Sequence, residues 1–230
     1  MSHTSFAGFS RDAIAFLGEL RLNNERGWFS ANRERCRLVL EEPGQACLES
    51  FIAGFGTALK RPQQGKTFRL HRDLRFSKDK TPYNTHLRMA ISEAPSGSRD
   101  ERDCMDRPGW FFSLEPDRLI LGCGLHAFSK QGLVAWREAL LDPVSGAAFD
   151  KLAGKAIQAG LRMHEPELKR VPAGMDPAHP REAQLRCKGM ASWQELPLAP
   201  ELFTPEAIPW CLSRWKAHRP LFDWLQQLEH

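Results

Sequence analysis

The chain lacks the long apolar segments that mark membrane and secreted proteins. None of its 230 residues lies in an apolar run near the ~20 residues that a membrane-spanning helix needs. Residues 1–10 contain neither the basic region nor the apolar stretch of a signal peptide. We therefore expect a soluble, cytoplasmic protein with no membrane partner.

Closely spaced cysteines are also missing. The cysteines stand singly, and no two form a Cys-x-x-Cys pair, so the usual zinc and thiol redox motifs are absent. We expect reduced, mostly buried thiols and no metal or other cofactor. The six cysteines are Cys36, Cys47, Cys104, Cys123, Cys187 and Cys211.

Tyrosine is scarce and neither sign of charge is in large excess. Tyr83 is the only tyrosine, against 14 Phe, which favours core packing over a wet binding surface. A net charge of +4 permits an anionic small molecule or a nucleic acid as partner without requiring one.

With 42% hydrophobic residues and no internal repeat, residues 1–230 are predicted to form a single globular domain. The sequence does not indicate how many copies of the chain associate. Within it, residues 93–108 are rich in Pro, Gly, Ser and charge and are predicted to form a mobile loop.

The spacing of apolar residues changes along the chain from helical to alternating and back. Helical spacing predicts helices over residues 10–22, 28–40, 48–59, 129–141 and 147–160 and in the C-terminal part. Alternation predicts strands over residues 68–76, 86–91, 110–115 and 118–126, the last two joined in a hairpin at Pro116-Asp117. Pro43-Gly44 is expected to break the second helix, and Pro220 to start or kink a C-terminal one. This order predicts an α+β fold with an antiparallel sheet of about four strands covered by helices.

The segment from Arg69 to Arg88 is the strongest candidate for a site. In the predicted strand 68–76, Arg69, His71, Asp73 and Arg75 share one face, which His86 and Arg88 of the next strand would extend. Arg72 falls on the apolar face instead. A buried guanidinium needs a partner, so Arg72 is either part of a structural ion pair or the floor of an anion site.

The connection between these two strands has the composition of an oxyanion-binding turn. Lys78, Asp79, Lys80 and Tyr83 stand among hydroxyl side chains, and such groups bind phosphate or carboxylate through charge-assisted hydrogen bonds. The glycine spacing of a nucleotide-binding loop is absent. A solvated hairpin loop that keeps the sheet edge soluble is the alternative.

Other chemistries find less support. His71, Asp73, His86 and His126 could approach one another, but Arg69 and Arg75 would repel a cation, so no metal site is predicted. No Gly-x-Ser-x-Gly motif is present for nucleophilic catalysis. Asp73 or Asp79 could act as acid or base, although carboxylates beside arginines usually have lowered pKa values.

Two further features lie later in the sequence. Gly122 and Gly124 leave one strand face bare before His126, which lets a helix, another backbone or a ligand approach. Lys169-Arg170, Arg186 and Lys188 form a second basic cluster, whose relation to the first the sequence leaves open.

With these segments identified, the chain resembles a family of conserved uncharacterised proteins, the domain of unknown function numbered 2461. Four segments, within residues 9–225, carry the resemblance: Asn23-Asn24 with Trp28-Phe29, Arg72 to Tyr83, Trp110 to Glu115 with Gly122 to His126, and Pro172-Ala173-Gly174 to Gly189. The resemblance implies one soluble domain without an assigned activity. The charged residues 99–107 and the scarcity of Tyr depart from the family pattern.

Three functions remain open from the sequence. The first is a binding module for an anionic, phosphate-bearing ligand held by the basic segment. The second is an enzyme that acts on a phosphorylated or carboxylated small molecule with Asp and His as acid and base, and the third is a structural or interaction protein. The candidate ligand-binding residues are Arg69, His71, Arg72, Asp73, Arg75, Lys78, Asp79, Lys80, Tyr83, His86 and His126.

Overall fold

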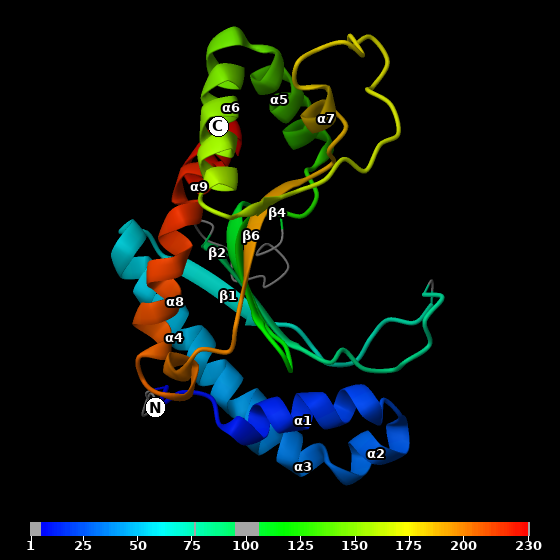
Figure 1. Cartoon of the computed structure of the whole chain (residues 1–230), viewed down its shortest axis with the longest axis vertical. Coiled ribbons are helices and arrows are strands. Elements are labelled where there is room, and N and C mark those ends of the chain that lie inside the picture. Colours follow the sequence, from blue (N-terminus) through cyan, green and yellow to red (C-terminus); the bar gives the residue numbers. More distant parts are fainter. Residues whose placement is uncertain (1–5, 76, 95–105, 230) are drawn as a thin grey trace. The chain divides into compact units, whose positions relative to one another are not determined.

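The predicted α+β class is confirmed in a computed structural model, which describes residues 6–75, 77–94 and 106–229 (Figure 1). The strands form an antiparallel sheet in the order β1-β2-β3-β4-β6-β5, so the sheet has six strands rather than about four. The strands are β1 (Gln63–Thr67), β2 (Leu87–Glu93), β3 (Gly109–Leu114), β4 (Leu119–Leu125), β5 (Arg162–Met163) and β6 (Met190–Leu196). Most of the predicted loop 93–108 lies outside the described residues.

The chain divides into two compact units. The first comprises residues 1–104, 111–121 and 195–214, and the second residues 105–110, 122–194 and 215–230. The single globular domain expected from the sequence remains a prediction.

Within the described ranges, no helix is both long and apolar enough to cross a membrane.

Capping residues in the sequence mark both ends of the first helix of the first unit. The Ser10 side chain accepts a hydrogen bond from the Ala13 amide and starts α1, and Asn23 ends it, which confirms the helix predicted over residues 10–22. Ala13, Phe16, Leu17 and Leu20 form its buried face. The helices of this unit are α1 (Arg11–Leu22), α2 (Arg26–Ala31), α3 (Arg33–Cys36), the π-turn η1 (Arg37–Glu41), α4 (Glu42–Leu59), the 3-10 turn η3 (Pro200–Phe203) and most of α8 (Ala207–Trp215).

The predicted break at Pro43-Gly44 was wrong. Helical backbone continues from η1 into α4, and Pro43 occupies the first turn of α4, where its missing N–H costs little. Glycine at position 44 leaves room for β2, because a Cβ there would lie 3.1 Å from the Leu87 side chain. The two residues therefore allow a helix to begin and a strand to approach it.

The helix α4 covers one face of β1 and β2. The two strands pair with Gly65 opposite Ile91, and a Cβ on Gly65 would meet the side chain of Leu48 in α4 at 2.8 Å. Leu87 and Met89 face α4 as well, next to Gly44. This face is the apolar core side of the sheet.

The strand predicted over residues 68–76 was also wrong. The ladder between β1 and β2 ends at Thr67 opposite Met89, and the residues beyond it are irregular apart from one bridge between His71 and Tyr83. Side chains of this segment hydrogen-bond to its own backbone instead, as in Asp73 with the Arg75 amide. Phe76 lies outside the described residues.

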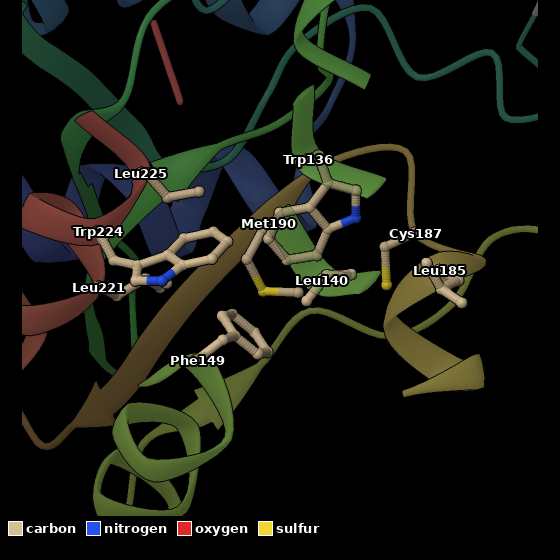
Figure 2. Close-up of a cluster of buried hydrophobic side chains, with 9 residues drawn as sticks. All are labelled: Trp136, Leu140, Phe149, Leu185, Cys187, Met190, Leu221, Trp224 and Leu225. Atoms are coloured by element: carbon tan, nitrogen blue, oxygen red, sulfur yellow. The ribbon is translucent and has the colours of Figure 1, made fainter. Parts of the chain in front are cut away.

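The second unit has an aromatic core of its own (Figure 2). The side chains of Trp136, Phe149 and Trp224 converge, with ring centroids 5.3 Å apart for Trp136–Phe149 and 5.6 Å for Trp136–Trp224. Ser129 and Asp142 cap the two main helices of this unit. Its helices are α5 (Lys130–Leu141), α6 (Pro143–Gln158), α7 (Glu182–Leu185), α9 (Arg219–Gln226) and the 3-10 turns η4 (Lys216–His218) and η5 (Gln227–Glu229).

The predicted hairpin is confirmed. The Glu115 amide donates to the Arg118 carbonyl at 2.9 Å and closes the turn at Pro116-Asp117. Gly124 has a φ of 145°, and a Cβ on it would lie 2.2 Å from the Met190 carbonyl oxygen. The close approach at Gly124 is thus that of β6, the neighbour of β4 in the sheet, and the predicted use of a bare strand face stays a prediction.

Candidate functional site

Residues 68–86, called the arm below, leave the sheet at the end of β1 and return to it at β2 (Figure 1). Three backbone hydrogen bonds hold its two halves together. The Phe68 amide donates to the Arg88 carbonyl at 2.9 Å, Asn84 to Leu70 at 2.6 Å and Arg72 to Pro82 at 2.9 Å. The arm is therefore a long irregular hairpin.

Asn24 and Phe29 anchor the returning half of the arm. The Asn24 amide group donates to the Tyr83 carbonyl at 2.8 Å, and its oxygen accepts from the Tyr83 amide at 3.0 Å. The Tyr83 ring stacks on Phe29 with centroids 4.0 Å apart, and His71 packs against its edge. Only 5% of Tyr83 is exposed, so its ring serves to fix the arm to α2.

Arg72 holds the far part of the arm together. Its guanidinium donates to the Asp79 carboxylate at 2.5 Å, to the Thr81 carbonyl at 3.1 Å and to the Ser77 hydroxyl at 3.2 Å, and it also contacts the Thr81 hydroxyl. Of the two roles left open by the sequence, these contacts match the structural ion pair. The predicted burial was wrong, since 24% of the side chain is exposed.

The two aspartates of the arm are ionised hydrogen-bond acceptors. Asp73 accepts from the Arg75 guanidinium at 2.6 Å, and these hydrogen bonds lower the pKa of its carboxyl to about 2. The Thr81 amide and Arg72 do the same for Asp79, whose pKa is also lowered to about 2. Carboxyl groups of such low pKa hold no proton at neutral pH.

The cationic side chains point in large part to solvent. Arg69, Arg75, Lys78 and Lys80 are exposed, and the Lys80 ammonium donates to the Leu74 carbonyl at 3.0 Å. Residues 69–88 contain six Lys and Arg against two Asp, so the segment is strongly positive. The structure thus brings four predicted cations onto one anchored hairpin.

The histidines of the predicted site occupy different places. His71 is exposed at the edge of Tyr83, and His86 is half-buried where β2 begins. Burial lowers the pKa of His86 to about 4, helped by the nearby charges of Arg88, Arg21 and Arg72. His126 belongs to the second unit and is not part of the arm.

The described residues give no support to metal or thiol chemistry. No group of three or more His, Cys, Asp or Glu among them is placed to hold a metal ion. Five of the cysteines are buried and free, and burial raises the pKa of Cys36 and Cys187 to about 12. Cys104 lies outside the described residues.

Two sets of contacts were not predicted. In the sequence Asn24 stands out only as part of the family resemblance, and nothing local to it indicates a bond to a residue 59 positions away. In the second basic cluster, Arg186 pairs with Glu182 at 2.8 Å, and the Lys188 amide donates to Glu167 at 2.8 Å. The Lys188–Glu167 bond and the Leu168 amide, which donates to the Arg186 carbonyl at 3.1 Å, join residues 167–168 to residues 186–188, so these contacts are structural.

The comparisons with known proteins agree with the resemblance seen in the sequence. No curated protein matches the chain. A family model described as conserved hypothetical protein (DUF2461) matches residues 12–224, which is nearly the whole chain and includes all of the arm. The chain therefore belongs to the conserved hypothetical protein family DUF2461.

Proposed function

We propose that this protein is a binding module for an anionic, phosphate-bearing ligand, which the arm holds by its exposed cations. The observation that carries the proposal is the combination of a positive surface with an anchored backbone. Asn24 and Arg72 fix the two ends of the hairpin, so Arg69, Lys78 and Lys80 are presented on a backbone that is already ordered. Ordering in advance lowers the entropy that binding costs.

The state of the acidic groups favours binding over acid–base catalysis. Asp73 and Asp79 are held by Arg75 and Arg72 with pKa values of about 2, far below the range suited to proton transfer at neutral pH. His86, with its pKa lowered to about 4, is neutral at that pH. Asp73, Asp79 and His86 thus contribute fixed structure or no charge.

The test is fluorescence anisotropy of labelled single-stranded DNA and RNA with the full chain and with the double variant Arg69→Ala/Lys78→Ala. Counterion release predicts that log K falls with log salt, and that removal of two contacts reduces the slope by roughly 1.4 for single strands. The double variant Lys151→Ala/Lys155→Ala removes the same charge from exposed positions of α6 and is the control.

The proposal predicts that the arm variant binds weakly at low salt and that the control binds like the parent chain. Equal binding by both variants would place the ligand away from the arm. Absence of binding to either oligonucleotide, together with absence of binding to polyphosphate, would refute a phosphate-binding arm.

A further inference from the structure

The far part of the arm is held together by its own side chains and backbone. The Arg72 guanidinium donates to Asp79 and Thr81, and the Arg72 amide donates to the Pro82 carbonyl at 2.9 Å. The contacts to Asn24 and Phe29 lie nearer the sheet, at Tyr83. The arm therefore continues beyond this anchor as a two-stranded ribbon, which Figure 1 shows extending away from the ends of β1 and β2.

Two pairs of cations lie at the two ends of this ribbon. The root pair is Arg69 and Arg88, which are exposed where the Phe68 amide donates to the Arg88 carbonyl at 2.9 Å. The far pair is Lys78 and Lys80, which are also exposed. The two aspartates of the arm are already bound by other arginines. Among the described residues, no carboxylate forms an ion pair with either pair of cations, so their charge is available to a ligand.

The separation of the two pairs favours a polymer over a small molecule. The Lys80 ammonium donates to the Leu74 carbonyl at 3.0 Å, so the far pair begins level with Leu74. Leu74 is five residues beyond Arg69, which is up to roughly 17 Å of extended chain. A single phosphate group binds one pair at a time, whereas duplex DNA carries a charge every ~1.7 Å along its axis and supplies phosphates to both pairs.

The aromatic side chains of the arm favour a double strand over a single one. Proteins that bind single strands stack the bases on exposed aromatic rings. The Tyr83 ring is 5% exposed and stacks on Phe29, and His71 packs against the edges of both rings. The half-buried Phe68 ring lies under the Lys66 ammonium at 5.1 Å. The described rings of the arm are thus occupied by other side chains, and a duplex, whose bases are already stacked, needs none of them.

The width of the ribbon matches one groove of one kind of duplex. Backbone bonds between Leu70 and Asn84 and between Arg72 and Pro82 keep the two halves of the arm at the spacing of paired strands, about 5 Å. The major groove of B-DNA, about 12 Å wide, admits a two-stranded ribbon, whereas its minor groove is about 6 Å wide. The major groove of duplex RNA is too narrow for side chains to enter.

We propose that the ligand of the arm is double-stranded DNA, with the far part of the arm in the major groove and the root and far pairs at phosphates of the duplex. The inference rests on the proposed function, because it concerns the same arm. It adds the class of the ligand and the way in which the arm meets it.

The test is fluorescence anisotropy of the full chain with double-stranded DNA, single-stranded DNA and double-stranded RNA of equal length at several salt concentrations. Four phosphate contacts predict a slope of log K against log salt of roughly −3.6 for double-stranded DNA. Double-stranded DNA should bind about tenfold more tightly than the other two, since its groove adds contacts that they lack. Equal affinity for double-stranded and single-stranded DNA, or tighter binding of double-stranded RNA, would overturn the inference.

The double variant Arg69→Ala/Lys78→Ala removes one cation from each pair. It should reduce the salt slope for double-stranded DNA by roughly 1.8. Neither side chain bonds to another described residue, so the variant should keep the melting temperature of the parent chain. Lys151→Ala/Lys155→Ala, on exposed positions of α6, is the control and should keep the parent slope. An unchanged slope in the arm variant, or an equal decrease in the control, would overturn the inference.

Modified DNA identifies the groove. Bulky substituents on C5 of the thymines fill the major groove and should weaken binding about tenfold or more. Netropsin, which fills the minor groove, should leave the affinity unchanged. Loss of binding with netropsin and not with the C5 substituents would overturn the placement of the arm in the major groove.

Failure of this inference is distinguishable from failure of the proposed function. Single-stranded DNA or polyphosphate that binds the parent chain but not the arm variant, without any preference for double-stranded DNA, would keep the phosphate-binding arm and overturn the double-stranded ligand. Absence of binding to every nucleic acid and to polyphosphate would refute both.

Discussion

The exposure of Arg72 and of its partner decides how much this residue contributes to the free energy of unfolding. An arginine sealed in a core with one carboxylate would destabilise the protein by about 3–5 kcal/mol if that pair were broken. In the arm, however, 24% of the Arg72 side chain and 59% of the Asp79 side chain are exposed. Water therefore solvates both charges in part and replaces some of the lost interaction.

Substitution of Arg72 by Ala is expected to lower the free energy of unfolding by about 1–2 kcal/mol, since several charge-assisted hydrogen bonds are lost but none is fully buried. The measurement is urea denaturation of the two chains. Arg75→Ala is the control, because the Arg75–Asp73 pair is exposed on both sides, and it should leave stability unchanged. A loss of stability as large for Arg75→Ala as for Arg72→Ala would contradict the role given to Arg72.

At the scale of elements, alternating apolar residues predicted some strands correctly and one wrongly. The strands β2, β3 and β4 lie where the pattern placed them, since each has a buried face. Residues 68–76 show the same alternation but leave the sheet: their backbone bonds to the returning half of the arm at Leu70 and Arg72, and the Asp73 side chain takes the Arg75 amide. The spacing of apolar residues indicates which side chains are buried, but it does not indicate whether the backbone hydrogen-bonds to a neighbouring strand.

The close approach of β4 to β6 gives a prediction at this scale. In Gly124→Ala the new Cβ would meet the Met190 carbonyl oxygen at 2.2 Å, on a residue with a φ of 145°. We expect a loss of stability of about 3 kcal/mol or more, because backbone must move. The measurement is again denaturation by urea.

Gly154→Ala provides the matched control for this prediction. Gly154 lies within α6 and has nothing within 4 Å of the added methyl group. Alanine at such a helical position should be neutral or stabilise by about 0.5–1 kcal/mol. Similar effects of the two substitutions would show that the approach of β6 does not depend on Gly124.

At the scale of the whole molecule, stability depends on pH through buried histidines. His218 is 1% exposed, its Nδ1 lies 2.7 Å from the Ser192 hydroxyl, and its Nε2 lies 3.2 Å from the Gln194 amide. Burial lowers the pKa of His218 to about 4. The folded chain therefore keeps this ring neutral at pH values at which the unfolded chain protonates it.

The sign of the effect follows from linkage. Above about pH 6.5 neither state binds the proton, and between about pH 6.5 and pH 4 only the unfolded state does, so stability falls as the pH falls through this window. For His218 we expect a loss of about 2 kcal/mol between about pH 7 and pH 5. His86, with the same direction of shift, adds to the loss.

The measurement is urea denaturation at these two pH values for the parent chain, for His218→Gln and for His126→Gln. The first variant should lose much of the pH dependence, whereas the second removes an exposed histidine and should keep it. A His218→Gln chain that loses stability on acidification as steeply as its parent would contradict the assignment.

The sequence by itself determined the α+β class, most helices and strands, the hairpin at Pro116-Asp117 and the location of the positive arm. These features depend on capping residues, apolar spacing and charge within a few positions of one another, which the sequence displays directly. Only the tertiary structure decided that Asn24 holds Tyr83 across 59 residues and that Arg72 binds Asp79 and Thr81 within its own hairpin. The first contact joins residues that the path of the chain brings together, and the second needs a hairpin where the apolar alternation predicts a strand, so no local pattern encodes either.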